Sequence, residues 1–405
     1  MNRRDFLTVG TLSMGAIGLP SLAESDVKQK HAKSTIFIFL GGGISHQESF
    51  IASPTFTEKA RSVNGYVETK HGFRLGGLFT ELGKVSHLYS PIHSYGHINP
   101  SHGSATSYQM TGYNENSEEV QTHPSMGSLV NRAYGATSPI GVPHYVALNK
   151  THGDAASYLG NSYNPFGITE EGKKNLTLDI EKTRFNQRME MMDMLDKSFL
   201  KNRSTQDVSG YKRQGREMLL GGVRDVFDAK NEPEKVRARY GKEGTFSEQC
   251  MMARRLVENG VKFVTINYGG WDMHTDIKTG YEGRAPELDH GLSTLLQDLS
   301  ERGLLETTLV VVTSEFSRTL LNSGNGRDHH PGTTALLMAG GNYIGKGAIG
   351  SIEKDGMFPK DKPYKPLDLL NTVISHMEIS GKTQFQDLSG RPRFTVNGEA
   401  SIIGA

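Results

Sequence analysis

The chain has 405 residues, which is long enough for one large α/β domain with insertions. It carries 45 Lys and Arg against 44 Asp and Glu, and this balance excludes a strongly basic nucleic-acid-binding protein and an acidic disordered chain. The 47 glycines have no three-residue period, which excludes collagen, and the single cysteine, Cys250, excludes an internal disulfide and a thiolate zinc site. The 15 histidines are therefore the main candidate ligands and catalysts.

The first residues have the pattern of an export signal. Arg3 and Arg4 precede a weakly apolar stretch that ends with small residues at Ala23. We therefore expect residues 1–23 to be a signal peptide that the twin-arginine export machinery recognises, and the mature protein to be periplasmic or otherwise exported. The stretch is too short and too polar to stay in the bilayer, so no permanent membrane span is expected.

Strand and helix patterns alternate along the rest of the chain. Residues 34–40, STIFIFL, form an apolar run that is typical of a strand buried on both faces. Similar strands are expected at 143–148, 261–266, 308–313 and 334–339. Helical patterns lie between them at 101–112, 125–134, 246–259 and 287–302. This alternation predicts an α/β fold, with a mostly parallel central sheet and helices on both faces, in a single domain over residues 34–405.

One segment breaks this alternation. Residues 170–245 are charged and rich in methionine, and two helical patterns lie within them. We interpret the segment as a helical insertion into the domain. Its methionine stripe, RMEMMDM, is interpreted as core packing rather than as a cofactor site.

Polar side chains follow the predicted strands at their carboxyl ends, where ligands bind in open α/β sheets. Because these ends meet at one edge of the sheet, residues far apart in sequence are expected to converge there. The candidate metal ligands at this edge are His46, Asp272, His274, Glu315, Asp328 and His330.

The spacing of Asp272 and His274 supports a metal site. In an extended segment the two side chains point to the same side, and a histidine from the 328–330 run, Asp-His-His, can complete a set of three N/O ligands. Adjacent histidines in extended backbone face opposite ways, so only one of His329 and His330 is expected to reach the site. Asp328 is either a ligand or the partner that orients an imidazole. The alternative for Asp272 and His274 is a capping Asp and a surface His in a turn.

A second stretch with several candidate catalytic residues begins at His97. Pro100 and Ser101 precede a helix of small residues, so the Ser101 hydroxyl is expected at the helix N-terminus. There the backbone N–H groups favour an anion and activate a nucleophile. An ordinary N-cap is the alternative interpretation of Ser101.

These segments resemble two related groups of proteins. PSHGSATSYQMTG is similar to the nucleophile helix of the alkaline phosphatase and sulfatase superfamily, with Ser101 at the nucleophile position. The order of Asp272-Met-His274, helix, strand, acid and His330-Pro-Gly follows the same superfamily. More closely, the mature chain resembles the exported bacterial family called domain of unknown function 1501, through motifs such as GGWDMHTD, TLVVVTSEFSRT and GRDHHPG. The resemblance implies an alkaline-phosphatase-like sandwich.

The chain departs from the superfamily pattern at its second metal site. Gly41-Gly42-Gly43 stands where the superfamily has a bridging Asp, and Glu315-Phe316 stands in place of an Asp-His pair. The resemblance therefore implies one divalent cation (Zn, Ca, Mg or Mn) on Asp272, His274 and His330. A second metal would need substitute ligands, for which His46, Glu48 and Glu315 are the candidates.

Two functions follow from this resemblance. The first is an exported hydrolase of phosphate or sulfate esters. In it Ser101 or a metal-bound water attacks, His102 or His97 acts as acid or base, and Arg318 holds a small anionic ester. The alternative is a non-catalytic binding or assembly protein on a degenerate alkaline-phosphatase-like fold. The glycines after the first strand lack the spacing of a dinucleotide-binding loop, and nucleic acid is not an expected partner.

Overall fold

The central element of the computed structural model is β1 (Ser34–Phe39), a strand that is buried along its whole length. The structure describes residues 33–114, 121–135, 137–138, 141–167, 180–199, 212, 215–220, 223–387, 389–396 and 401–402, and the predicted signal peptide lies outside these residues. β1 pairs in parallel with β7 and β8, and a seven-stranded sheet extends from it in the order β4-β11-β8-β1-β7-β5-β6. The other six strands of this sheet are β4 (Tyr89–Pro91), β5 (Tyr145–Leu148), β6 (Phe166–Gly167), β7 (Phe263–Asn267), β8 (Thr308–Thr313) and β11 (Leu336–Ala339).

The sheet is parallel except at one strand. β11 runs antiparallel to both of its neighbours, β8 and β4, and the remaining pairs are parallel. All five strands that the sequence predicts are present, with ends that differ by up to two residues. The predicted α/β fold with a mostly parallel sheet is confirmed.

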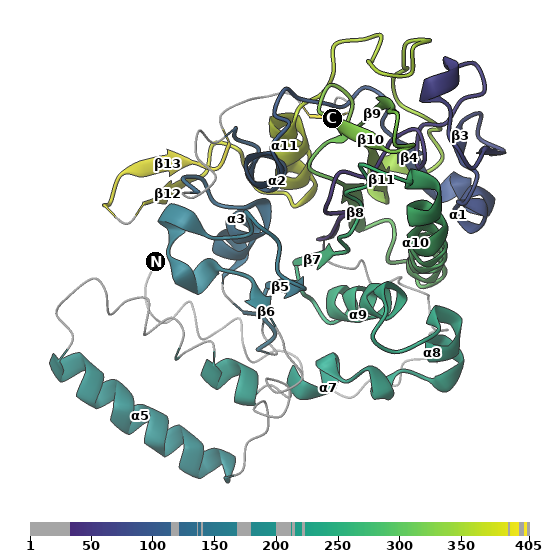
Figure 1. Cartoon of the computed structure of the whole chain (residues 1–405). Coiled ribbons are helices and arrows are strands. Elements are labelled where there is room, and N and C mark those ends of the chain that lie inside the picture. Colours follow the sequence, from purple (N-terminus) through teal and green to yellow (C-terminus); the bar gives the residue numbers. More distant parts are fainter. Residues whose placement is uncertain are drawn as a thin grey trace, which may run out of the picture. The chain divides into compact units, whose positions relative to one another are not determined.

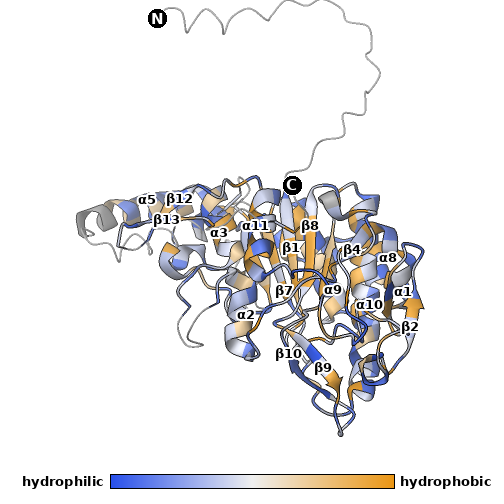
Figure 2. Ribbon diagram, turned by 90° about the horizontal axis from the view of Figure 1, so that it is seen from above, coloured by the Kyte–Doolittle hydropathy of each residue, from blue (hydrophilic) through white to orange (hydrophobic). Residues whose placement is uncertain are grey.

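Helices cover both faces of the sheet, as Figure 1 shows. On one face Ile36 and Ile38 of β1 pack in a core with α9 (Phe246–Glu258) and α10 (Ile277–Glu301). On the other face Phe37 and Phe39 pack in a second core with α2 (His102–Thr111), α3 (Met126–Tyr134) and α11 (Pro366–His376). The apolar strands lie between these two helical layers in Figure 2. Because successive residues of β1 face opposite layers, Ile36–Phe39 are all apolar, and the polar residues Ser34 and Thr35 at the start of the strand are buried as well.

Shorter elements surround this core. Three two-stranded sheets pair β2 with β3, β9 with β10 and β12 with β13. Their bounds are β2 (Tyr66–Glu68), β3 (Arg74–Gly76), β9 (Ser317–Leu321), β10 (Arg327–His330), β12 (Gln384–Gln386) and β13 (Pro392–Phe394). The remaining described helices are α1 (Thr80–Lys84), α5 (Lys182–Phe199), α7 (Val223–Phe227) and α8 (Glu234–Tyr240). Single 3-10 turns span Glu58–Ala60, Ser86–Leu88, Ser157–Leu159, Asn161–Tyr163, Ala229–Asn231 and Gly341–Tyr343.

The predicted helix at 287–302 is wrong in its start. α10 begins at Ile277 and contains Pro286. Asp276 caps it by accepting a hydrogen bond from the N–H of Thr279, and burial of its apolar face compensates for the hydrogen bond that a proline cannot donate. The other three predicted helices agree with α2, α3 and α9 to within one residue at each end.

The segment 170–245 contains α5, α7 and α8 in its described ranges, and its role as an insertion stays a prediction. The interpretation of its methionine stripe as core packing is wrong. Met191 and Met194 are 65% and 68% exposed, and Met192 is also exposed. Within the described ranges every helix is too short or too polar to cross a membrane.

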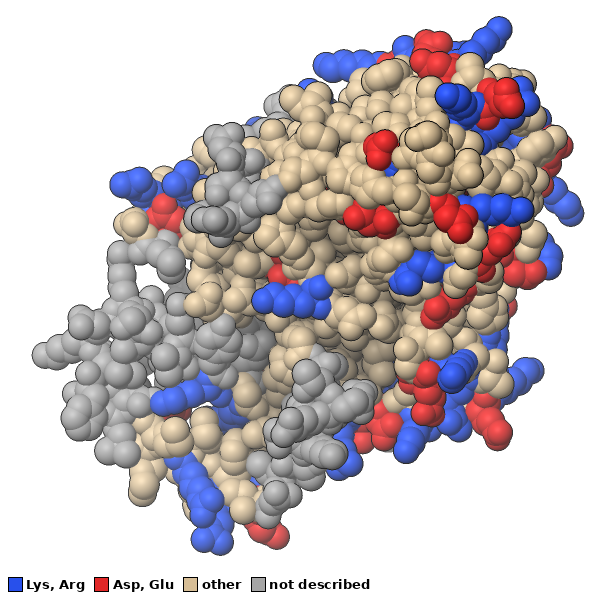
Figure 3. All heavy atoms as spheres, viewed as in Figure 1, with Lys and Arg blue, Asp and Glu red and all other residues tan. Residues whose placement is uncertain are grey.

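Charged side chains of both signs are interspersed on the face shown in Figure 3. They gather over the region that holds α8 and α10 in Figure 1, and no broad patch of one sign is visible among the coloured residues. A nucleic-acid-binding face needs clustered Lys and Arg. The predicted absence of a nucleic-acid partner stays a prediction.

Candidate metal centre

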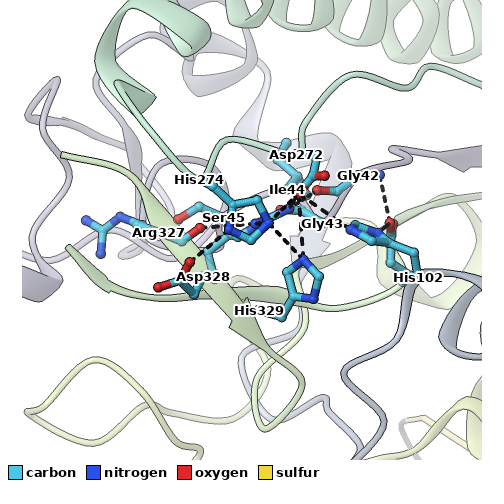
Figure 4. A network of polar contacts seen from close by, with 12 residues as sticks. Gly42, Gly43, Ile44, Ser45, His102, Asp272, His274, Arg327, Asp328 and His329 are labelled. Atoms are coloured by element: carbon cyan, nitrogen blue, oxygen red, sulfur yellow. Dashed lines mark hydrogen bonds and ion pairs between the residues drawn. The ribbon is translucent and has the colours of Figure 1, made fainter. Parts of the chain in front are cut away.

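Asp272 lies at the centre of a polar cluster beyond the carboxyl end of β7 (Figure 4). Its Oδ1 atom lies 3.0 Å from Nε2 of His274, 3.5 Å from Nε2 of His102 and 3.7 Å from Nε2 of His329. The three histidines come from separate segments: the loop after β7, the first residue of α2 and strand β10. A metal site requires imidazole nitrogens and carboxylate oxygens from separate segments to lie close together, and this cluster meets that requirement.

The other ring nitrogen of each histidine is held by an acceptor. Nδ1 of His102 lies 2.6 Å from Glu315, and Nδ1 of His274 lies 2.8 Å from Asp328. Nδ1 of His329 lies 2.8 Å from the carbonyl oxygen of Pro100. A carboxylate or a carbonyl accepts only, so in each neutral ring the hydrogen lies on Nδ1 and Nε2 keeps its lone pair. Metal-ligating histidines have this tautomer and this kind of outer partner.

Three of these residues form a compact candidate ligand group. The ligand atoms of His102, Asp272 and His329 all lie within 4.8 Å of one another. Nε2 of His102 is buried and has no hydrogen-bond partner among the described residues. Nε2 of His274 lies 3.1 Å from Nε2 of His329, a distance at which two lone pairs repel unless a cation or a proton lies between them. The residues therefore fit a metal ion.

Glu315 supports His102 from behind. Its side chain is buried after β8, where Oε1 accepts a hydrogen bond from the N–H of Gly42 and Oε2 accepts one from the hydroxyl of Ser314. The hydrogen bond with Glu315 raises the pKa of His102, although burial opposes the shift. Glu315 is predicted as a metal ligand, but in the structure it accepts a hydrogen bond from the His102 ring and lies outside the candidate ligand group.

Arg318 holds Asp272 and does not present a free fork to an anion, which corrects its predicted role. The side chain is fully buried. Its Nε donates to the carbonyl of Gly43, Nη1 to the carbonyl of Arg327 and Nη2 to the carbonyl of Gly42. The remaining two donors face Oδ1 of Asp272, at 2.5 Å, and Nε2 of His274, at 3.4 Å. Burial raises the pKa of Asp272, but the hydrogen bond and charge of Arg318 outweigh it and lower that pKa overall.

His330, a predicted ligand, lies outside the cluster, and His329 takes its place. In the β9–β10 pair His329 lies opposite Arg318, whereas His330 lies opposite Ser317. Neighbouring residues of a strand point to opposite faces, so only His329 shares a face with Arg318 and Asp272. Nε2 of His330 lies 2.7 Å from the carbonyl oxygen of Met357.

His46, another predicted ligand, is also bound elsewhere. Its Nδ1 lies 2.6 Å from the hydroxyl of Ser317, and its Nε2 lies 2.8 Å from the carbonyl of Gly356. Burial lowers the pKa of His46 to about 3, so the ring is neutral and both nitrogens support the fold. Glu48 likewise pairs with the buried Arg327 at 2.9 Å. Neither side chain is available as a substitute ligand for a second metal.

His97 and Ser101 lie on the segment that leads into α2. Nε2 of His97 lies 2.6 Å from the backbone carbonyl of Glu315, and its Nδ1 accepts from the N–H of Asn99. Burial lowers the pKa of His97 to about 4, so the ring is neutral and is a structural contact between the two segments. This corrects its predicted acid/base role. Ser101 is the N-cap residue of α2, as predicted, next to His102. Its role as a nucleophile stays a prediction.

Asp328 lies at the exposed side of the cluster. The hydrogen bond with His274 lowers the pKa of Asp328, and the amide of Asn322 also faces the carboxylate, at 3.4 Å. Of the two roles open to Asp328, the structure places it as the partner of an imidazole. The sequence left open which of His329 and His330 reaches the site, because strand alternation limits the choice to one histidine but does not say which, and it gave no signal for the Pro100 carbonyl. His102, which the sequence predicted as an acid or base, lies in the candidate ligand group.

The fold and this cluster together define an α/β protein with a candidate mononuclear metal centre. A family model described as "Protein of unknown function (DUF1501)" matches residues 32–404, and the chain belongs to that family. The family that the motifs predicted is thus confirmed. No curated protein matches the chain.

Several solved structures resemble the chain at low identity. Ps i-CgsB in complex with k-i-k-neocarrahexaose is 12% identical, with a TM-score of 0.42, over 86% of this chain and 73% of that chain. The phosphonate monoester hydrolase SpPMH from Silicibacter pomeroyi is 11% identical, with a TM-score of 0.40, over 89% and 75%. A protein in the alkaline phosphatase superfamily from Vibrio parahaemolyticus is 9% identical, with a TM-score of 0.37, over 87% and 67%. The chemistry of this chain has to be inferred from its own site.

Proposed function

We propose that the chain is a metal-dependent hydrolase of phosphate or sulfate esters, with one divalent cation on His102, Asp272 and His329. The observation that carries the proposal is the convergence of histidine Nε2 atoms on Oδ1 of Asp272, with each Nδ1 held by an acceptor. His274 stands beside this triad, within 3.1 Å of His329.

The donor set favours zinc among the divalent cations. Two imidazoles and a carboxylate are a common catalytic zinc set. Calcium and magnesium prefer sets made of oxygen atoms, which this cluster does not offer. A bound cation would supply Lewis-acid polarisation of an ester oxygen.

The residues of the chain provide the rest of the chemistry. Ser101 lies where the first N–H groups of α2 favour negative charge on an attacking oxygen. Glu315 fixes the His102 ring, and Asp328 fixes the His274 ring on the exposed side of the triad. Arg318 balances the charge of Asp272 and locks its position.

The test is metal content followed by ester hydrolysis with the full chain. We expect purified protein to hold one zinc ion per chain and to hydrolyse p-nitrophenyl esters of phosphate or sulfate. Asp272→Asn and His329→Ala should lose both the metal and the activity, whereas His290→Ala, an exposed histidine of α10, should keep both. Metal-free protein, or activity that survives both site variants, would refute the proposal.

One observation favours the non-catalytic alternative. Oδ1 of Asp272 is already paired with the buried guanidinium of Arg318, so the cluster has a partner for its central carboxylate without a metal. On this alternative the chain is a binding or assembly protein. Trapping of a covalent phosphate or sulfate group on Ser101 would exclude it.

We also propose that the protein is exported through the twin-arginine route and acts outside the cytoplasm. The support is the pair Arg3-Arg4 ahead of the weakly apolar stretch that ends near Ala23. Because that route carries folded proteins, the metal centre can be assembled before export.

A further inference from the structure

We infer that the site accepts a singly charged tetrahedral ester, such as a sulfate monoester or a phosphodiester, and discriminates against a doubly charged phosphate monoester. The inference rests on the proposed function and names its substrate class. It follows from the charges and contacts around Asp272.

The charged groups of the cluster cancel. Three carboxylates belong to it: Asp272 at the centre, Glu315 behind His102, and Asp328 behind His274. One guanidinium, that of Arg318, contacts it. The ligands His102 and His329 are neutral when they hold a metal, and His274 is counted in the neutral tautomer described above, with its Nδ1 hydrogen toward Asp328. A single divalent cation therefore brings the site to zero net charge, with no positive excess for a dianion.

Arg318 cannot compensate by rotating toward a substrate. Its five N–H groups face three backbone carbonyls, Asp272 and His274. The loop that carries two of these carbonyls packs closely against the site, because a Cβ on Gly42 would lie 2.6 Å from the N atom of Asp272, and one on Gly43 would lie 3.1 Å from Nε of Arg318. The guanidinium therefore contributes positive charge to the site, but it has no unpaired N–H group to donate to a substrate.

A second metal cannot supply the missing charge either. Among the described residues a single group of His, Cys, Asp and Glu side chains meets the geometry of a metal site, and it is the triad of His102, Asp272 and His329. The loop after β1 carries Gly41, Gly42 and Gly43, which offer no side-chain ligand. Glu48 and His46, the nearest substitutes in sequence, are committed to Arg327 and to Ser317.

The electrostatic consequence is a preference set by substrate charge. A monoanion leaves the occupied site with one uncompensated negative charge, and a dianion leaves two. Because the neutral site offers no positive charge to offset the lost hydration of the second negative charge, we expect a dianion to bind at least about tenfold more weakly than a monoanion of the same shape.

The test compares substrates and anions of the same shape and different charge on the zinc-loaded full chain. At about pH 8 a phosphate monoester carries two negative charges. We expect kcat/KM for bis(p-nitrophenyl) phosphate or p-nitrophenyl sulfate to exceed that for p-nitrophenyl phosphate by at least about tenfold. Faster turnover of bis(p-nitrophenyl) phosphate would identify a phosphodiesterase, and faster turnover of p-nitrophenyl sulfate would identify a sulfatase. Calorimetry should show that dimethyl phosphate, a monoanion, binds more tightly than methyl phosphate, a dianion.

The two proposals fail in different ways. Absence of turnover with every ester would end the proposed function, while the calorimetric ratio would still test the charge class. Equal or tighter binding of methyl phosphate would overturn the inference even in an active enzyme.

A charge variant gives a sharper test. Asp328 is 59% exposed on its side chain, so Asp328→Asn removes one negative charge with little risk to folding. It should reduce the preference for the monoanion severalfold. Glu306→Gln makes the same change at an exposed residue before β8, at the opposite end of that strand from the site, and should leave the preference unaltered. An unchanged preference in Asp328→Asn, or an equal reduction in both variants, would overturn the inference.

Discussion

The carboxylate of Glu315 lies 2.6 Å from the imidazole of His102, measured from Oε1 to Nδ1, and this contact joins two residues that are 213 positions apart. It connects the loop after β8 to the first residue of α2. Because Glu315 is itself held by Gly42 and Ser314, the His102 ring is fixed with Nε2 toward Asp272.

Replacement of this carboxylate should weaken metal binding. Glu315→Gln keeps the shape of the side chain and removes its charge, so His102 becomes a poorer ligand. We expect zinc affinity to fall by about 10- to 100-fold, measured by competition with a chromophoric chelator. Glu306→Gln is the matched control. Unaltered zinc affinity in Glu315→Gln would show that the contact is structural only.

Acid should destabilise the fold through buried neutral histidines. Burial lowers the pKa of His46 to about 3 and the pKa values of His93 and His376 to about 4. The unfolded chain therefore takes up protons below its ordinary histidine pKa of about 6.5, while the folded chain does not, and stability is lost as the pH falls from there toward 4.

Each such histidine contributes up to about 1.4 kcal/mol per pH unit in that window. Asp289 opposes the loss, because burial raises its pKa to about 6. The free energy of unfolding, measured by urea titration at several pH values, should fall between pH values of about 6.5 and 4.5. A flat or rising profile would contradict this account.

A methyl group on Gly42 should disturb the site and the fold together. Gly42 has a φ of 109°, and a Cβ there would lie 2.6 Å from the N atom of Asp272. Gly65 has a φ of 76° with nothing within 4 Å of such a Cβ. Gly65→Ala should therefore cost about 1–2 kcal/mol from backbone strain alone. Gly42→Ala should cost about 1–3 kcal/mol more, because the new contact is with backbone.

Thermal and urea unfolding of the two glycine variants give the comparison, and zinc titration gives a second readout. Zinc affinity should fall in Gly42→Ala only. Equal destabilisation of the two variants would show that close packing at Gly42 is unimportant.

A buried ion-pair network between α9 and the residue two positions before α8 should contribute to stability. Glu232 pairs with Arg254 at 2.7 Å and with Arg255 at 2.5 Å, and all three side chains are buried. Glu232→Ala leaves two buried guanidinium groups with fewer acceptors and should cost about 3–5 kcal/mol. Glu68→Ala removes the exposed pair with Arg74 and should cost less than about 1 kcal/mol. Urea denaturation measures both, and similar costs would contradict the role of burial.

Export should depend on the two N-terminal arginines. Arg3→Lys combined with Arg4→Lys should leave the precursor in the cytoplasm, because the export machinery recognises the arginine pair. Fractionation with mass determination of the N-terminus measures this, and mature protein should begin at Glu24. Lys28→Arg is the control. Normal processing of the double variant would indicate a different route.

The contribution of the sequence is clearest at the central strands. The centres of β1 and β8 are continuous apolar runs, and such runs are stable only where both faces are buried, so their place inside a parallel sheet follows from composition. That placement also puts Asp272, His274 and Glu315 at one edge of the sheet, since each follows a strand. The start of α10 could not be predicted from the sequence, because Pro286 interrupts the helical pattern. In the structure the helix continues on the N-terminal side of Pro286, where burial of its apolar face and the Asp276 cap stabilise it.

The tertiary structure alone decided which of these residues face one another. Alternation along a strand limits the choice to one of His329 and His330, but the pairing of β10 with β9 determines that His329 shares a face with Arg318. The same packing directs every N–H group of Arg318 to a backbone carbonyl, Asp272 or His274. It also places the carboxylate of Glu315 within hydrogen-bond distance of His102. These contacts join segments tens to hundreds of residues apart. Local patterns fix which side chains come to the edge of the sheet, and long-range packing fixes their orientation and partners.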